Sequence, residues 1–444
     1  MRLKHILNRT RQAKQIIRKV KCGIYVFFIC FILVLVAEER VFVTGNSQQK
    51  IPLLIGVVGK DRELNELAAI IKKDLCFSRQ FSVDITIFKK KPAKKTVKKL
   101  FKQGYLLAIF INFDNSKNSV IEWRLYDTAQ AMMVQGKKYT KQESYLGGWA
   151  HNITDMIWPV LTGQEGFFSS KIAYCKEILT KAGGVTKHIC VADYDGSNEQ
   201  VIVNSPTVNI APRWNKDITN PLLFYSEHTN TNVRLMVVDT KKKSHIASNF
   251  DGINMLPTFS KDGKTVIYCA SRGDGSCQLY QYEKNKLKRL TNNMGNNISP
   301  SFGDNEIIYF CSDFQTKKPQ IYAYNLQKNE FQQLTEGGYC TSPDYCAKTG
   351  KLVYTKMVNG LMQLFIYDSK TKNHTQLTVD AGNKHECIWS PCGNYILFAT
   401  DYAYKSRIAF LSLLTKERRF LTPADKSCDY PSWSLCFKVF PIFS

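Results

Sequence analysis

The sequence lacks the motifs that mark several common kinds of functional site. No Cys-x-x-Cys pair occurs among its 14 cysteines, so a structural zinc site is not expected. No Gly-x-Ser-x-Gly is present, although an α/β-hydrolase requires this nucleophile elbow. The segment Gly56-Val57-Val58-Gly59-Lys60 lacks the spacing and the following Ser or Thr of a phosphate loop. The motifs for these three kinds of chemistry are therefore missing.

Acidic residues are scarce compared with basic ones. The chain of 444 residues has 37 Asp and Glu against 61 Lys and Arg, which gives a formal net charge of +24. Much of this charge lies in two runs, residues 2–21 and residues 89–102. The second run predicts a Lys-rich helix from Pro92 to Gln103, either a solvated face or a patch for phosphate or anionic lipid. No nucleic-acid partner is expected, because the amino terminus has the layout of an export signal, described next, and export would carry this patch away from most nucleic acid.

The sequence also has no apolar run long enough for an ordinary membrane-spanning helix. The apolar segment Ile24 to Val36 has about 13 residues, whereas a span needs roughly 20. A basic flank, a short apolar core and Ala37 before charged residues are typical of an export signal cleaved after Ala37. An uncleaved anchor at residues 1–37 is the alternative. Both interpretations deliver the rest of the chain to the far side of a membrane.

The cysteines allow two interpretations. Cys22 and Cys30 lie in the apolar segment, and the other twelve include four pairs of near neighbours in sequence. A disulfide requires Cα atoms within about 7 Å, which spacing alone does not establish. Buried free thiols that pack as small hydrophobic groups are the alternative, and the sequence leaves both open.

Residues 51–165 have the pattern of a small α/β domain. Continuous apolar runs predict buried strands, alternating runs predict half-buried strands, and apolar residues at helical spacing predict amphipathic helices. The expected strands are 51–58, 81–88, 105–112, 120–126 and 131–139, and the expected helices are 61–76, 92–103 and 144–161.

Two polar groups resemble functional motifs. His151 and Asp155 lie four residues apart on one helix face, so they could form half of a proton relay or a structural pair. We favour the structural pair, since no motif supplies a nucleophile. Asp193-Tyr194-Asp195-Gly196-Ser197 resembles the start of a calcium loop, but Asn204 occupies the place of the final Glu. A hairpin turn explains this segment better.

A short motif then recurs along the rest of the chain, and we call it the Pro-x-aromatic motif. Its aromatic residues are separated by 45, 43, 43, 44 and 44 residues, which is the length of a four-stranded propeller blade. Cys replaces Pro in the fifth copy. The six copies are Ala211-Pro212-Arg213-Trp214, Leu256-Pro257-Thr258-Phe259, Ser299-Pro300-Ser301-Phe302, Ser342-Pro343-Asp344-Tyr345, Glu386-Cys387-Ile388-Trp389 and Tyr430-Pro431-Ser432-Trp433.

The two ends of the repeat array predict how it closes. The first unit begins at Lys171 with what matches the second strand of the others, and the sixth motif has no blade after it. Placing the last segment into the first blade completes six blades and leaves no open sheet edge. We therefore expect an α/β amino-terminal domain followed by an all-β six-bladed propeller at 166–436, closed by the C-terminal strand, and a tail at 437–444.

Three segments resemble the TolB family, the exported propeller proteins of the Tol-Pal envelope system. They are Arg124-Leu125-Tyr126-Asp127, the segment from Ala150 to Asp155, and the linker from Leu161 to Tyr174, which reads LTGQEGFFSSKIAY. The resemblance covers the chain from Glu38 to about Trp433. It implies a non-enzymatic periplasmic accessory protein without a cofactor or bound metal, associated peripherally with the envelope and monomeric outside its complexes.

The family resemblance also implies two partner-binding sites. A TolA-like inner-membrane protein would bind the extended segment at 38–50, through Glu38, Glu39, Arg40, Val41, Phe42, Val43 and Thr44. The alternating charged and apolar residues of this segment suit a strand added to a partner's sheet edge. A Pal-like lipoprotein would bind the mouth of the propeller channel, where the aligned positions are Ile253, Leu256 and Ile298.

Two other functions are consistent with a propeller. The first is a peptidase in which the propeller gates a hydrolase domain, but only about ten residues follow the last repeat. The second is a propeller that holds a metal or quinone in its channel and acts on saccharides. The motifs offer Arg213, Asp344 and Glu386 there, without a repeated ligand pattern.

Overall fold

The computed structural model describes residues 50–114, 117–140, 145–180, 183–273, 275–402 and 404–437. The expected export signal and the expected TolA-binding residues 38–44 lie outside these ranges. None of the helices within them combines the length and the apolar character that a membrane crossing requires.

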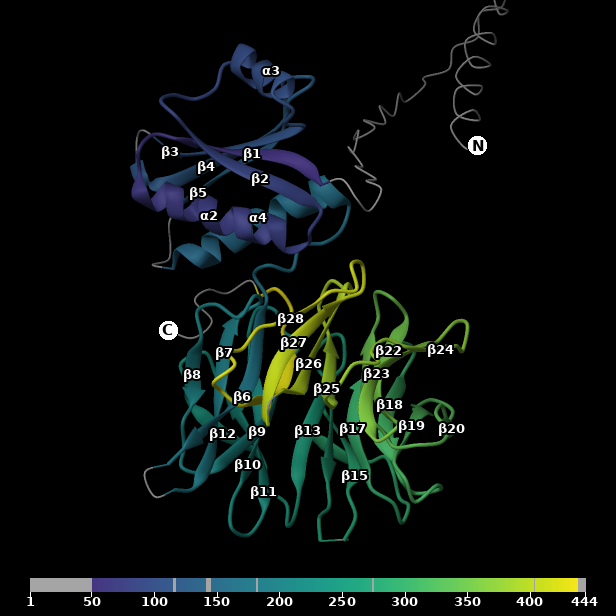
Figure 1. The fold of residues 1–444 in the computed structure, drawn as a ribbon. Coiled ribbons are helices and arrows are strands. Elements are labelled where there is room, and N and C mark those ends of the chain that lie inside the picture. The colour runs from purple at the N-terminus through teal and green to yellow at the C-terminus, as the bar shows by residue number, and fades with distance from the viewer. Residues whose placement is uncertain are drawn as a thin grey trace, which may run out of the picture. The chain divides into compact units, whose positions relative to one another are not determined.

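The amino-terminal part of the described chain is a five-stranded mixed sheet with the order β2-β1-β3-β4-β5 (Figure 1). The three strands β1, β2 and β3 are parallel, and β4 and β5 continue the sheet in antiparallel fashion. The strands are β1 (Ile51–Val58), β2 (Phe81–Phe88), β3 (Leu107–Asp114), β4 (Lys117–Asp127) and β5 (Met132–Thr140). β1 lies between β2 and β3, and six of its eight residues are buried, as its continuous apolar run predicts.

Three helices cover the two faces of this sheet. Apolar residues of α2 (Arg62–Phe77) and α4 (Leu146–Thr162) pack into one cluster with β1, β2, β3 and β4. On the opposite face, Val97 and Leu100 of α3 (Lys94–Lys102) pack against Leu54 and Phe110. The Asp61 side chain caps α2 by accepting a hydrogen bond from the Leu64 backbone N–H at 3.1 Å. The expected strands 51–58 and 81–88 match the observed bounds, and the helix ends differ by one or two residues.

The carboxy-terminal part is a β-propeller built from five sheets, which confirms the order of an α/β region followed by a propeller. Four sheets have four strands each, and consecutive strands pair antiparallel within each of them. Their strands are β13 (Asn254–Phe259), β14 (Val266–Ala270), β15 (Gln278–Glu283), β16 (Lys286–Arg289); β17 (Asn297–Phe302), β18 (Ile307–Ser312), β19 (Gln320–Asn325), β20 (Glu330–Gln333); β21 (Cys340–Cys346), β22 (Lys351–Val358), β23 (Leu361–Asp368), β24 (His374–Gln376); β25 (Lys384–Trp389), β26 (Tyr395–Tyr402), β27 (Lys405–Ser412) and β28 (Arg418–Phe420).

The fifth sheet has eight strands and contains the closure. Its two antiparallel halves are joined through a single parallel residue pair, Lys187 with Val208. As expected, the C-terminal strand β29 pairs with β6, the first strand of the propeller. The strands are β6 (Lys171–Leu179), β7 (Val185–Asp193), β8 (Gln200–Val203), β9 (Val208–Trp214), β10 (Leu223–His228), β11 (Val233–Val238), β12 (Ser244–Ser248) and β29 (Cys428–Trp433).

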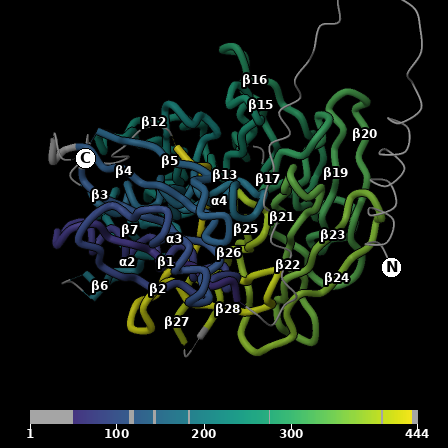
Figure 2. The backbone as a smooth tube through the Cα atoms, turned by 90° about the horizontal axis from the view of Figure 1, so that it is seen from above, coloured from purple at the N-terminus to yellow at the C-terminus, as the bar shows by residue number. Residues whose placement is uncertain are grey.

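Each copy of the Pro-x-aromatic motif lies in a different strand, and these strands are neighbours in a closed series. The series is β9, β13, β17, β21, β25 and β29, and β29 returns to β9. Figure 2 shows β17, β21 and β25 next to one another within it. The repeated sequence therefore lines the inside of the propeller.

All six motif strands share the same backbone irregularity. The residue before the Pro position has a left-handed φ between 50° and 55° in every copy, at Ala211, Leu256, Ser299, Ser342, Glu386 and Tyr430. Pairing with the adjacent strand shifts register at this point each time, as in a β-bulge. A left-handed residue other than Gly costs roughly 1–2 kcal/mol, so the surrounding sheet must hold this conformation in place. The fifth copy keeps the bulge although Cys387 replaces Pro.

Candidate functional site

The six motif strands surround a cavity of about 330 Å³. Residues of all six contribute to its wall, from Arg213 and Lys216 in and just after β9 to Tyr430 and Trp433 in β29. Apolar, cationic and anionic side chains are all present in this wall. Such a mixture of apolar surface with a few polar groups is typical of a binding site for a peptide or small molecule.

The structure brings together two of the three residues expected to contact Pal. Leu256 and Ile298 both line the cavity, and both pack against the apolar cluster of the β13 and β17 sheets. Ile253 lies apart from them, immediately before β13. Its backbone N–H donates to Ser271 Oγ at 2.9 Å, and it forms an isolated bridge with Val233. Ile253 therefore belongs to the loop that enters the strand, and it does not line the cavity.

The motifs place one cationic and two acidic side chains in the cavity wall, Arg213, Asp344 and Glu386. Burial and, to a smaller extent, the negative charge of Asp429 together raise the pKa of Glu386 to about 7, although the Tyr430 backbone N–H and Arg213 act in the opposite direction. Burial also raises the pKa of Asp344, although the Trp389 backbone N–H and the cations Lys216 and Arg213 act in the opposite direction. These shifts follow because burial penalises the charged form of a carboxyl group.

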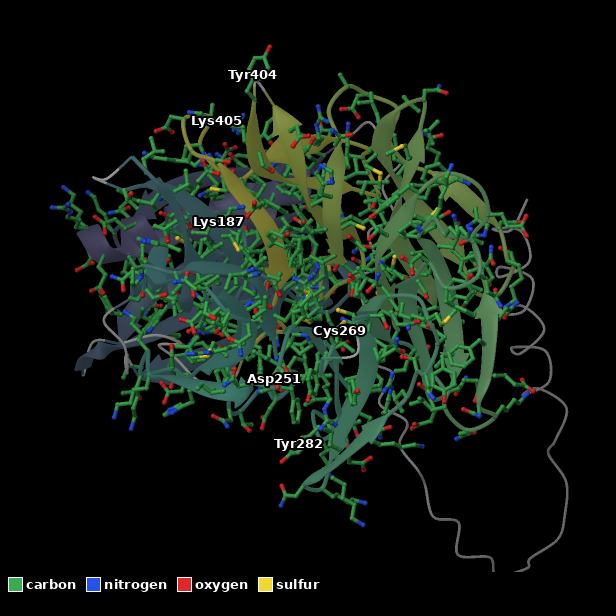
Figure 3. The ribbon with its side chains drawn as sticks, turned by 90° about the horizontal axis from the view of Figure 1, so that it is seen from below. Lys187, Asp251, Cys269, Tyr282, Tyr404 and Lys405 are labelled. Atoms are coloured by element: carbon green, nitrogen blue, oxygen red, sulfur yellow. The ribbon has the colours of Figure 1, made fainter. Side chains whose placement is uncertain are left out.

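An ion pair that the sequence did not predict lies beside this wall. Lys187 in β7, labelled in Figure 3, forms an ion pair with Asp429 in β29. Burial lowers the pKa of Lys187, but the charge of Asp429 and a hydrogen bond to it raise that pKa overall. Asp429 directly precedes the sixth motif, so its position relative to Pro431 could have indicated it. Lys187 lies outside the motif, and no sequence signal connects it to the channel.

The motif strands are connected to one another by side chain to backbone hydrogen bonds. The residue after Pro accepts the aromatic residue's N–H from the next motif, with distances of 3.3 Å for Thr258 to Phe302, 3.0 Å for Ser301 to Tyr345 and 2.8 Å for Asp344 to Trp389. Ile388 occupies this position in the fifth copy, and it has no side-chain oxygen that could accept a hydrogen bond from the next motif. Instead, Glu386 accepts the Tyr430 backbone N–H at 3.0 Å. In the fifth copy the acceptor thus stands two positions earlier, and its donor is the residue before Pro431 instead of the aromatic residue.

His151 and Asp155 are both structural, but they do not pair with each other as expected. His151 Nδ1 lies 2.9 Å from Asp74 Oδ2, and Asp74 also accepts hydrogen bonds from Thr154 and Tyr194, at 2.9 Å and 2.8 Å. His151 Nε2 is 3.5 Å from Asp193 Oδ2, too long for a good hydrogen bond. Burial alone would lower the pKa of His151, yet the two carboxylates raise it to about 10.

Asp155 holds the segment that leads from α4 into the propeller. It accepts hydrogen bonds from the backbone N–H groups of Phe168 and Ser169, at 2.7 Å and 2.9 Å. A side chain at Gly166 would collide with Asp155, because a Cβ there would lie 2.4 Å from Oδ1. The pairing of His151 with Asp74 could not be seen from the sequence, since 77 residues separate the two.

The segment that resembled a calcium loop is a hairpin turn between β7 and β8, as expected. Gly196 has a φ of 85°, and the Asp193 N–H donates to the Ser197 carbonyl at 2.8 Å. Across the described ranges, no group of three or more His, Cys, Asp or Glu side chains has the arrangement of a metal site.

The twelve cysteines from Cys76 to Cys436 are all free thiols. Nine of them are buried, including Cys269 and Cys277, which are near neighbours in sequence. Burial raises the pKa of Cys269 well above its usual value, which makes this thiol unreactive in the folded protein. Of the two interpretations open from the sequence, the structure has the buried free thiols.

The family model for the TolB beta propeller domain matches residues 158–437 of the chain. The chain belongs to the TolB family. The TolB match includes all six Pro-x-aromatic motifs and the whole ring of strands around the cavity.

Individual members of the TolB family are similar to most of the chain or to part of it. The Tol-Pal system protein TolB of Francisella tularensis subsp. tularensis (strain FSC 198) is 25% identical over 436 residues, covering 94% of this chain and 98% of its own length. The protein of the same name from Gluconobacter oxydans is 30% identical over 177 residues, or 39% of this chain and 38% of its own. The crystal structure of TolB from Acinetobacter baumannii has the same fold, with a TM-score of 0.73, 22% identity, and coverage of 87% of this chain and 96% of that one.

Proposed function

We propose that this protein is a non-enzymatic binding hub of a Tol-Pal envelope system. It works in the periplasm, associates peripherally with the envelope, supports outer-membrane integrity and cell division, and acts without a cofactor. The observation that carries this proposal is the family match over the propeller together with a cavity that all six motif strands line. A binding hub needs such a preformed surface and no reacting groups.

We propose further that the propeller has six blades. The eight-stranded sheet counts as two of them, with β29, β6, β7 and β8 in one blade and β9 to β12 in the other. Two features support this count: the halves share only the pair Lys187 and Val208, and each half contains one motif strand with the same bulge. Six equivalent inner strands would give a Pal-like partner a nearly symmetric ring of loops to contact.

The channel mouth is proposed to bind a Pal-like lipoprotein, with Ile253, Leu256 and Ile298 in contact. The test is the affinity of the host's own purified Pal-like protein for Leu256→Asn and Ile298→Asn variants. Asn tolerates the left-handed φ of 53° at position 256, so the backbone is preserved while the apolar contact is lost. We expect roughly tenfold or greater weakening for each, since burying such a side chain contributes about 1.5–3 kcal/mol.

The matched control for this test is Ile246→Asn. Ile246 lies in β12, outside the cavity, and is 55% exposed, so its replacement should leave the affinity unchanged. Equal weakening by all three variants, or none by the two cavity variants, contradicts the proposed Pal surface.

The segment from Glu38 to Thr44 is proposed to bind a TolA-like inner-membrane protein. Its role depends on a free amino terminus, so N-terminal sequencing of the protein isolated from its host is the first measurement. Deleting residues 38–44 should abolish binding of the host's TolA-like protein and leave Pal binding intact. A deletion variant that still binds the TolA-like protein with full affinity would refute this assignment.

A further inference from the structure

The exposed face of α3 carries an unusual concentration of lysine. Lys95, Lys98, Lys99 and Lys102 follow the spacing i, i+3, i+4 and i+7, which places them on one helix face. All four are exposed, and the buried face of the helix consists of Val97 and Leu100. We call these four residues the α3 lysine face.

The α3 lysine face has no acidic partner within the part of the chain that the structure describes. The ion pairs of this region use other residues: Lys91 and Arg124 both bind Glu122, at 2.6 Å and 2.5 Å. Asp84 accepts a hydrogen bond from Tyr105 at 2.9 Å. The four lysines therefore present uncompensated positive charge to an external partner.

This charge pattern disfavours the helix that carries it. Lys95 and Lys99, and likewise Lys98 and Lys102, are like charges at i and i+4, which repel each other. No acidic residue stands in the first turn, and Ala93 at the N-cap provides no side-chain hydrogen bond. A merely solvated face would be more stable with mixed charges. The lysines thus have the pattern of a surface whose charge matters for binding.

An exposed aromatic ring lies beside these lysines. Phe101 follows Lys98 by three residues, and it is 46% exposed although the helix has a buried apolar side. Lysines around an exposed aromatic side chain match the chemistry of a lipid interface, where cations contact headgroup phosphates and the ring enters the boundary with the acyl chains. A nucleic acid or an acidic polysaccharide would use the charge without needing the ring to be buried.

We propose that the α3 lysine face, with Phe101, docks the protein onto a membrane surface containing anionic phospholipid. This inference goes beyond the proposed hub function and does not depend on binding of either protein partner. Each lysine near an anionic surface raises the partition coefficient about fivefold at low salt, so four raise it by a factor of several hundred.

The test measures binding of the full protein to phosphatidylethanolamine vesicles with and without phosphatidylglycerol, by cosedimentation. The vesicles without phosphatidylglycerol report any contribution from the amino-terminal apolar segment, which all variants share. A variant with Lys95→Gln, Lys98→Gln, Lys99→Gln and Lys102→Gln should lose the preference for the anionic vesicles, with a drop of roughly a hundredfold or more. Raising the salt concentration should weaken the wild-type preference.

The matched control replaces four other exposed lysines, Lys241, Lys243, Lys261 and Lys288, by Gln, which changes the net charge equally. This control should keep most of the preference, and Phe101→Ala should weaken binding several-fold to vesicles but not to heparin or duplex DNA. Thermal unfolding verifies that the variants fold. Equal losses of vesicle binding in the two four-lysine variants would overturn the lipid assignment. Binding of heparin or DNA that anionic vesicles do not compete away would overturn it as well.

Discussion

Glu386 lies in the wall of the channel and accepts a hydrogen bond from the Tyr430 backbone N–H. Its pKa of about 7 lies above the roughly 4.3 expected for an unfolded chain, because burial and Asp429 disfavour its charge. The native state therefore holds the proton more tightly than the unfolded state. Its contribution to the free energy of unfolding is most favourable below about pH 4 and falls as the pH rises to about 7.

We expect Glu386→Gln to remove this pH dependence. Gln is neutral and can still accept the Tyr430 N–H. The variant should be more stable than the wild type above pH 7, by about 1–3 kcal/mol, and the difference should shrink as the pH falls toward 4. Urea unfolding of both proteins across this range measures it. A constant difference across the range would show that Glu386 does not titrate as described.

Asp74 is the shared acceptor of a buried polar cluster, so its removal should be costly. Asp74→Asn leaves the His151 imidazolium without its main counter-charge, and we expect a loss of about 3–5 kcal/mol at pH 7. The raised pKa of His151 stabilises the native state below about pH 6.5, and this stability is lost as the pH rises toward 10. Urea unfolding should therefore show that the loss in Asp74→Asn is smaller at pH 10 than at pH 6. An equal loss at both would indicate that His151 is neutral throughout.

At the scale of elements, the residue after the proline connects one inner strand to the next in three of the motifs, through Thr258, Ser301 and Asp344. Ser301→Ala leaves the Tyr345 N–H without its 3.0 Å partner. We expect a loss of about 1 kcal/mol in the free energy of unfolding, the ordinary net value of such a bond. Ser82→Ala is the control, because Ser82 is exposed on β2. If both variants unfold at the same urea concentration, the bonds between motif strands do not contribute to stability.

The sequence predicted elements well where one residue pattern determines one structure. The apolar run 51–58 and the alternating run 81–88 predict the first and last residues of β1 and β2 correctly. A strand buried on both faces gives a continuous apolar run, and a strand buried on one face gives an alternating run. Each Pro-x-aromatic motif likewise marked a strand. The bulge at the residue before Pro had no sequence signal, since Ala, Leu, Ser, Glu and Tyr all occupy it.

The candidate site was less predictable because its residues come from distant parts of the chain. Leu256 and Ile298 could be placed at the channel by their position relative to Pro, but Ile253 could not be separated from them on the same ground. Lys187 and Asp429 are 242 residues apart, and only the closure of the propeller brings them together. Contacts created by closure have no local pattern.

At the scale of the whole molecule, the closing strand connects the two ends of the propeller. Trp433 packs into the main apolar cluster, its Nε1 donates to Ser170 Oγ at 2.9 Å, and the Ser434 N–H donates to the Lys171 carbonyl at 2.8 Å. A chain that ends before Cys428 would expose the edge of β6, which could pair with another chain.

We expect this truncated chain to aggregate or unfold, as judged by size-exclusion chromatography and circular dichroism. A chain that ends after Phe437 is the control. It keeps β29 and the contact between Phe437 and Trp214, whose ring centroids are 5.2 Å apart, so it should stay folded. A soluble, folded monomer lacking β29 would disprove the importance of the closing strand.

The free thiols give each part of the propeller a built-in reporter of local opening. Buried cysteines lie in all five sheets of the propeller, at Cys175, Cys269, Cys311, Cys340 and Cys387 among others. A buried thiol reacts with a labelling reagent only when its surroundings open, so its labelling rate measures the free energy of that opening. Mass spectrometry of a labelling time course would therefore rank the blades by local stability without any engineered probe. We expect the blade with the lowest free energy of local opening to be labelled first. A partner bound at the channel should slow labelling at Cys387, because Cys387 lines the cavity.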